Sequence, residues 1–202
     1  MKYPFVLTLI ACVTLVAAGQ TPSGSTAESK CTLTPEQAPE IRGVRLGMSA
    51  EQLQSLFPGE ANRQSINNAI SASKQAGAYG LANTELRPDR EAANPRFAGV
   101  NYISIGLLDE RVVRFYIAYT QVEWKSVDQF VTRLSEGLRL PNVSWEANGQ
   151  LSVLQCNGFN VEAYASRGSA DSLVRVTDTS VNKIVEDRRE VEREKARQVF
   201  KP

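Results

Sequence analysis

Residues that could carry out catalysis are scarce in this chain of 202 residues, which contains no histidine. Histidine is the usual general base and the commonest zinc ligand, so Ser–His and Cys–His nucleophile arrangements are excluded. One catalytic spacing is present, because Ser71 and Lys74 have the Ser-x-x-Lys pattern of penicillin-binding enzymes. The Ser-Asp-Asn and Lys-Thr-Gly elements of those enzymes are absent from the sequence, so we attribute the spacing to chance.

Acidic residues alone could support hydrolysis if two carboxylates faced each other within about 10 Å in a cleft. Asp109 and Glu110 are adjacent, but the sequence places them at a turn, where acidic residues are common. The sequence has no glycine-rich phosphate loop, and we expect no cofactor and no metal site. A hydrolase that uses only acids is therefore the third hypothesis for function, and we expect the protein not to be an enzyme.

The three cysteines have different expected fates. Cys12 lies in an apolar leader, which leaves Cys31 and Cys156 as an even pair. In an oxidising compartment such a pair predicts a disulfide, which would join the start of the fold to its far half. The alternative is two separately buried thiols.

Residues 1–19 are typical of a secretory signal peptide. Lys2 is followed by an apolar run over residues 5–16 and then by small residues, which predicts cleavage near Ala18 or Gly19. An uncleaved anchor is disfavoured because a spanning helix needs roughly 20 apolar residues. A second alternative is a lipid anchor at Cys12, because residues 9–12 have the apolar, apolar, small, Cys pattern of a bacterial lipidation site.

The remaining composition is that of an ordinary globular protein, with 42% hydrophobic and 22% charged residues and a net charge of +1. This balance gives no electrostatic reason to expect nucleic-acid binding. Residues 20–30 are small and polar, which predicts a flexible linker. We therefore expect a secreted or periplasmic bacterial protein, with no membrane span after signal removal, whose fold begins near Cys31.

Two capped helices organise the predicted fold. Ser49 is a predicted N-cap with Gln52 as its capping-box partner and Leu53 on the apolar face. The same Ser-x-x-Gln-apolar pattern recurs from Ser126 to Phe130, and each helix ends before a proline. Residues 61–76 have weaker helical periodicity and predict either a second helix or an ordered insertion.

Alternating apolar residues predict an antiparallel sheet. Residues 103–107 and 113–119 alternate around the turn at Asp109 and Glu110, which predicts a hairpin. Asn157-Gly158 predicts a second hairpin with a type I′ turn, in which Leu154 pairs with Val161 and Cys156 points into the core. Further strands are expected at 81–86 and 173–177.

The predicted fold class is α+β, with short helices packed on an antiparallel sheet. We expect a domain over residues 31–180 and a charged C-terminal helix over 181–202, whose first turns dock on the domain. Helix-then-hairpin order occurs twice, so the halves 31–120 and 121–180 are either a tandem duplication or similar by chance.

The segment Leu46-Gly47-Met48-Ser49, followed by Leu53, resembles the start of SmpA/OmlA-type small envelope lipoproteins and the related β-lactamase-inhibitor-protein-like domains. That resemblance implies a short helical segment on an antiparallel sheet, sometimes in tandem, in a protein that works by contact. It supplies no catalytic residues. The chain departs from the pattern in the short leader before Cys12 and in the extra segment 61–98.

The leading functional hypothesis is an extracytoplasmic, non-enzymatic module for protein interaction or envelope assembly, with another protein as its partner. Aromatic rings dominate binding surfaces, so the candidate contact residues are aromatic. They are Tyr102, Tyr116, Trp124, Trp145 and Tyr164. The alternative is a periplasmic carrier of a small apolar ligand, which would need a cavity of roughly 300 Å³ or more between sheet and helices.

Overall fold

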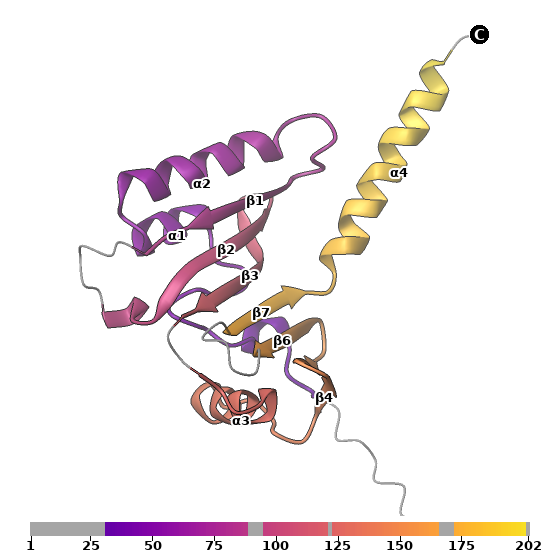
Figure 1. The fold of residues 1–202 in the computed structure, drawn as a ribbon. Helices are drawn as coiled ribbons and strands as arrows, with labels where there is room; N and C mark the ends of the chain where they lie inside the picture. The colour runs from indigo at the N-terminus through magenta and orange to yellow at the C-terminus, as the bar shows by residue number, and fades with distance from the viewer. Residues whose placement is uncertain (1–30, 89–94, 121–122, 166–171, 201–202) are drawn as a thin grey trace, which may run out of the picture.

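The computed structural model describes residues 31–88, 95–120, 123–165 and 172–200. Within these ranges the chain forms four α-helices, two short 3-10 helices and one seven-stranded antiparallel sheet, which confirms the predicted α+β fold. Figure 1 shows the helices arranged around the sheet, with the last helix extending away from it. The expected signal peptide at 1–19, with Cys12, and the linker at 20–30 lie outside the described residues.

The strand order of the sheet is β1-β2-β3-β7-β6-β5-β4, so β3 and β7 are the only neighbours that are not consecutive in the described sequence. The predicted strands and both predicted hairpins are present, whereas β4 was not predicted. The strands are β1 (Leu81–Leu86), β2 (Val100–Leu108), β3 (Arg111–Tyr119), β4 (Trp145–Asn148), β5 (Leu151–Gln155), β6 (Phe159–Ala165) and β7 (Ser172–Asp178).

Helix α1 (Ala50–Leu56) begins where the capping pattern predicts it. The Ser49 hydroxyl accepts from the backbone N–H of Gln52 at 3.2 Å, and the Gln52 side-chain oxygen accepts from the Ser49 N–H at 2.9 Å. Leu53 is fully buried, so the cap fixes an apolar residue against the sheet.

Helix α3 (Val127–Leu138) begins with half of the same motif. The Ser126 hydroxyl accepts from the Gln129 N–H at 3.2 Å, but the Gln129 side chain accepts from Lys125 N–H at 3.0 Å instead of from Ser126. Phe130 is buried at 5% exposure, in the place predicted by analogy with α1.

The weakly amphipathic segment after α1 is a helix, α2 (Glu60–Ser73). Ile66 and Ala69 are buried as their spacing predicts. Ser73 is also buried, and its hydroxyl donates to the Ile70 carbonyl at 2.7 Å, so the buried hydroxyl has a hydrogen-bond partner. This local hydrogen bond explains how a polar residue continues the buried face.

Helices α1, α2 and α3 cover the same face of the sheet. Leu53, Ile66 and Phe130, one from each helix, belong to a single buried cluster. That cluster also contains sheet residues from both halves of the chain, such as Ile105 on β2 and Val161 on β6. One core therefore spans residues 31–120 and 121–180.

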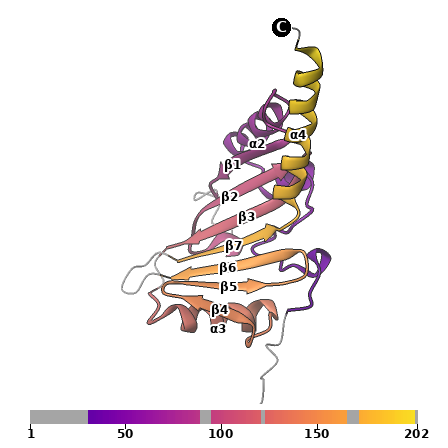
Figure 2. The ribbon, with the colours of Figure 1, turned by 90° about the vertical axis from the view of Figure 1, so that its right-hand side faces the viewer.

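The two halves meet at their last strands. Phe115 at the centre of β3 is the register partner of Val176 on β7. Each half runs from helix to antiparallel strands, and both sets of helices lie on one face (Figure 2). Both alternatives, a tandem duplication and two halves that are alike by chance, are compatible with this arrangement and stay predictions.

The 157–158 hairpin has the predicted register but a different turn. Leu154 pairs with Val161, yet Asn157 lacks the positive φ that a type I′ turn requires, so the predicted turn type is wrong. The Asn157 N–H donates to the Leu33 carbonyl at 3.0 Å. We attribute the change of turn to this contact with the N-terminal segment.

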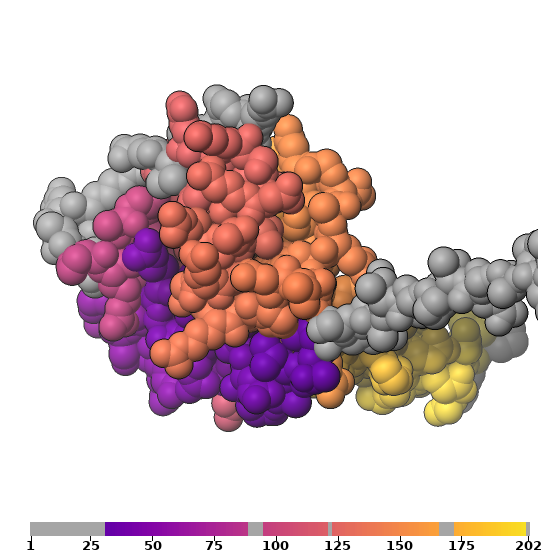
Figure 3. Space-filling model, turned by 90° about the horizontal axis from the view of Figure 1, so that it is seen from below, coloured from indigo at the N-terminus to yellow at the C-terminus, as the bar shows by residue number. Residues whose placement is uncertain are grey.

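The disulfide between Cys31 and Cys156 confirms the predicted pairing. Their Cα atoms are 4.6 Å apart across a sequence separation of 125 residues. Cys31 is buried, and Cys156 is half-buried against the main core. Figure 3 shows the first described residues, in indigo, lying against the orange second half. The bridge therefore joins the start of the fold to its last hairpins.

Helix α4 (Val181–Val199) packs on the other face of the sheet through its first turns, as predicted. Val181 and Val185 are buried against Leu108 and Val113, in a cluster separate from the main core. Val191 is 54% exposed, and Figure 2 shows the rest of the helix extending past the edge of the sheet. No helix in the described part of the chain is long and apolar enough to span a bilayer.

Candidate interaction surface

Among the described residues, no helix covers most of the sheet face opposite α1, α2 and α3. The strands alternate, so that on β7 Val174 and Val176 are fully buried while Leu173, Arg175 and Thr177 on the other side are accessible. Helix α4 occupies only the end of this face beside the β2–β3 turn. We call the remainder, formed by the outward residues of β1 to β7, the open face.

Three of the predicted contact residues lie on the open face, and two of them contact each other. Tyr102 on β2 and Tyr116 on β3 have ring centroids 5.6 Å apart at an interplanar angle of 81°. The Tyr116 hydroxyl donates to the Tyr102 hydroxyl at 3.3 Å. Tyr164 lies on the same face of β6, and its hydroxyl donates to Gln150 at 2.8 Å. All three are half-buried, with their rings accessible from this side.

Charged residues surround this aromatic group. The Arg175 guanidinium lies 5.8 Å from the centroid of the Tyr116 ring, and it forms a 3.1 Å ion pair with Glu162 on β6. Stacking of a guanidinium on an aromatic face is favourable and fixes the orientation of both groups. Sequence reasoning missed Arg175 and Glu162, although their place between buried residues on alternating strands marks both as outward.

Arg114 adds a cation that lies flat across the open face. It can do so because its register partner is Gly106, and a Cβ at that position would clash with the Arg114 side chain. Arg114 thereby reaches Asn83 on β1, to which it donates at 2.7 Å. The glycine is thus explained by close approach of a side chain, as strand glycines often are.

The two predicted tryptophans lie on the covered side of the sheet. Trp124 packs on Phe130 with ring centroids 4.9 Å apart, and its indole N–H donates to Ser172 at 3.3 Å. The Trp145 indole N–H donates to the Ser135 hydroxyl on α3 at 3.0 Å. Both rings pack against the main core. The structure therefore places the three tyrosines on the open face and the two tryptophans on the covered side of the sheet.

The acidic turn between β2 and β3 is held by two cations. Arg188 of α4 donates to both carboxylate oxygens of Asp109, at 2.9 and 2.6 Å, and to the Tyr79 carbonyl at 2.8 Å. This hydrogen bonding lowers the pKa of Asp109 below its ordinary value. Lys74 forms a 3.0 Å ion pair with Glu110. A carboxylate with a lowered pKa suits a lasting ion pair and does not suit a general acid.

Two adjoining hollows lie where α4 meets the loop after α2. One, of about 540 Å³, lies beside Tyr79 and Val191, and the other, of about 470 Å³, reaches Asp109 and Glu110. Lys74 lines both hollows, while Ser71 is exposed on α2. Since Lys74 is paired with Glu110, the geometry gives the Ser-x-x-Lys spacing no activated nucleophile.

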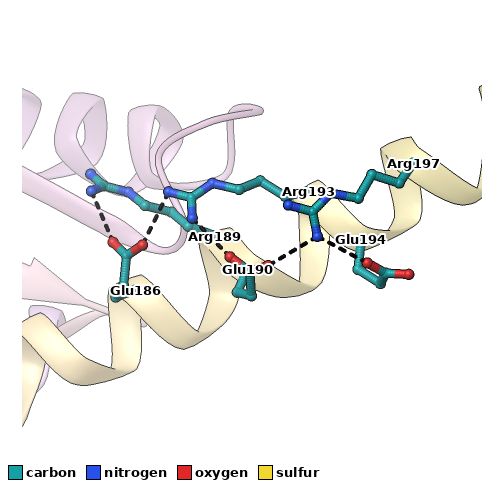
Figure 4. A network of polar contacts seen from close by, with 6 residues as sticks. All are labelled: Glu186, Arg189, Glu190, Arg193, Glu194 and Arg197. Carbon is teal, nitrogen blue, oxygen red and sulfur yellow. Dashed lines mark hydrogen bonds and ion pairs between the residues drawn. The ribbon is translucent and has the colours of Figure 1, made fainter.

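The exposed part of α4 is held together by its own charges. Arg193 pairs with Glu186 at 3.0 Å and with Glu190 at 2.8 Å, and Arg197 pairs with Glu190 and Glu194 (Figure 4). Exposed pairs of this kind are each weak, because solvent screens them and the long side chains lose entropy. Their repetition supports a helix that buries little beyond its first turns.

A third hollow, of about 350 Å³, lies between α3 and residues 40–42. Its lining includes the apolar side chains of Phe130, Leu134 and Leu138. Arg42 and Arg133 also line it. This cleft has the size expected of a small-molecule site, although Tyr119 at the end of β3 is the only strand residue among those described that lines it.

Within the described ranges, no group of three or more Cys, Asp or Glu residues could hold a metal ion. Comparison of the chain with protein-family models, with curated proteins and with solved structures found no match. The resemblance to SmpA/OmlA-type proteins therefore stays a prediction. The function is inferred below from the residues of the open face.

Proposed function

We propose that this protein is an exported, non-enzymatic module that binds another protein through the open face of its sheet, as interaction or envelope-assembly modules do. The observation that carries the proposal is that Tyr102 and Tyr116 contact each other beside Arg175, on a face that α1, α2 and α3 leave uncovered and that Tyr164 shares. Tyrosine and arginine are the residue types that contribute most to protein interfaces.

Export is supported by the disulfide between Cys31 and Cys156, because such bonds persist mainly in oxidising compartments. The leader at 1–19 supplies a matching signal. Intact-mass analysis of the protein purified from its source organism tests this part. We expect a chain that begins near Gly19 or Gln20 and lacks two hydrogen atoms relative to the reduced chain, as one disulfide requires. A diacylglyceryl mass on Cys12 would support the lipid-anchor alternative, and an uncleaved, reduced chain would contradict export.

Site-specific crosslinking tests the interaction itself. We would replace Tyr116 by p-benzoylphenylalanine in the full chain, irradiate intact cells of the source organism and identify the adducts by mass spectrometry. The control places the same group at Arg63, whose exposed side chain lies on α2, on the opposite side of the molecule. We expect a discrete protein adduct from position 116 and none from position 63. Equal adducts from both positions, or none from either, would contradict the proposal.

The carrier hypothesis is the second candidate, and the 350 Å³ cleft beside α3 is the observation that favours it. A carrier should bind a fluorescent apolar probe such as anilinonaphthalene sulfonate with one-to-one stoichiometry. Replacing Leu138, which lines the cleft, by Glu should abolish that binding. Probe binding that survives the Leu138→Glu substitution would count against this site.

A further inference from the structure

An apolar stripe crosses the open face at right angles to the strands. Strand register joins its members in sequence, because each is the cross-strand partner of the next. The stripe consists of Tyr102, Ala118, Leu173, Tyr164 and Leu151, from β2, β3, β7, β6 and β5. Every one of these residues is half-buried, so each keeps accessible apolar surface.

The face becomes more polar away from the stripe. Four positions further along the same strands, the outward row contains Arg114, Thr177, Asn160 and Gln155. Within the stripe, the polar tips of the tyrosines are already engaged, since Tyr102 accepts from Tyr116 and Tyr164 donates to Gln150. A partner therefore meets mainly ring and aliphatic surface at the stripe.

The direction of the stripe indicates the shape of its occupant. Five neighbouring strands span about 19 Å, since strands lie about 4.8 Å apart. A partner strand running parallel to the sheet strands would cross the stripe at one or two residues only. A helix laid along the stripe would cover its whole length with about 13 residues, at 1.5 Å per residue.

The protein already places a helix on this face in that orientation. Figure 2 shows α4 running across the direction of β1, β2 and β3. Val181, Ile184 and Val185 provide its apolar contacts with Leu108 and Val113. The open face thus accepts the apolar side of a helix that crosses the strands.

The charges beside the stripe indicate which residues flank the apolar side of the docked helix. The outward row beside the stripe contains Glu85, Glu162 and Glu146 but a single guanidinium, that of Arg175. Arg175 pairs with Glu162, and Glu85 pairs with Arg87 at the end of β1. Glu146 has no cation within ion-pair distance among the described residues. A lysine or arginine on the flank of a docked helix would complement this row.

We infer that the stripe binds an amphipathic helix of the partner protein, with its apolar residues on Tyr102, Leu173 and Tyr164 and basic residues over the acidic row. The inference rests on the proposed function and specifies the form of the partner. The contact would be of the class in which an amphipathic helix supplies the anchors through apolar residues at helical spacing.

A designed peptide tests the inference without knowledge of the partner. The probe is a hydrocarbon-stapled helix of about 14 residues made of leucine and lysine, with leucines on one face. Two control peptides have the same composition in scrambled order, or glutamate in place of lysine. Binding to the isotope-labelled protein is measured by NMR, with chemical-shift changes expected at the stripe.

Two matched variants locate the site on one strand. Leu173→Lys places a charge in the stripe, whereas Thr177→Lys places the same charge on the same face of β7, in the polar row. We expect at least a tenfold loss of affinity in Leu173→Lys and less than a twofold change in Thr177→Lys. Both positions are accessible, and unchanged circular dichroism would confirm that both variants fold.

Equal binding of the scrambled peptide, or shift changes confined to α3 or α4, would overturn the inference. So would equal affinity of the two lysine variants. Absence of peptide binding together with a crosslinked partner at position 116 would reject the helical partner and leave the proposed function standing. If neither peptide binding nor a crosslinked partner is found, the helical partner and the proposed function are both rejected.

Discussion

At the scale of single residues, the β2–β3 turn shows how strained backbone is supported by side chains. Asp109 and Glu110 both have positive φ, at 50° and 64°, a conformation that non-glycine residues seldom adopt. Each also carries a carboxylate that meets a cation from another element, Arg188 on α4 and Lys74 after α2. The turn therefore serves as the attachment point of α4.

Replacing Asp109 by Asn should loosen α4 with little effect on the rest of the fold. The substitution removes the charge that Arg188 binds with two hydrogen bonds, while the turn can persist because Asn tolerates positive φ. We expect several-fold faster amide exchange in α4 and a loss of less than about 1 kcal/mol in the free energy of unfolding. The control is Asp128→Asn at the exposed first turn of α3, which should leave exchange in α4 unchanged.

The same contact predicts a dependence on acid. Arg188 lowers the pKa of Asp109 from its ordinary value of 3.8, so the folded state favours the ionised carboxylate. The stabilisation is complete above pH 3.8 and is lost as the pH falls through the lowered value. Exchange in α4 should therefore rise in strong acid in the wild type and much less in Asp109→Asn. Identical acid profiles of the two proteins would contradict this assignment.

At the scale of elements, the parts predicted from sequence are those with local signals. The caps at Ser49 and Ser126 and the alternation around Asp109 needed only neighbouring residues to be recognised. Strand β4 was missed because Trp145 alone is directed to the core and the other residues are exposed at a sheet edge. The Asn157 turn was misassigned because a distant contact with Leu33 determines its backbone.

The disulfide is the element-level feature with the largest expected effect on stability. It links residues 125 positions apart and restrains the unfolded chain. We expect Cys31→Ser with Cys156→Ser to lower the free energy of unfolding by about 2–5 kcal/mol. Urea unfolding measures the difference, and the reduced wild type serves as the matched comparison. Equal stability of the oxidised wild type and the double variant would show that the bond is not formed in solution.

At the scale of the whole molecule, one long-range pairing creates the open face. The β3–β7 contact joins two sets of strands into one sheet and brings Tyr116 beside Arg175. Alternation of apolar and polar residues predicted that Tyr102 and Tyr116 would point outward. The pairing of β3 with β7 could not be predicted from neighbouring residues, because these strands are far apart in the sequence. The same limit explains why Arg175 and Arg188 were missed, since each acts on a residue from another element.

Placing α1, α2 and α3 on one face leaves most of the opposite face for contact. The aromatic group and the apolar stripe share this face, so one surface carries both the proposed function and the helical partner inferred from it. Helix α4 limits that surface at one end through Val181 and Val185. We therefore predict that a bound partner covers the open face of the sheet and leaves α1, α2 and α3 accessible.

Hydroxyl-radical footprinting of the protein with its crosslink-identified partner tests this claim most directly. Tyrosine side chains react readily, and their oxidation is quantified by mass spectrometry. We predict that binding protects Tyr102, Tyr116 and Tyr164 on the open face and leaves Tyr79, beside α4, as reactive as in the free protein. Unchanged oxidation of the three tyrosines, with protection confined to α3 or to α4, would show that the partner does not bind the open face.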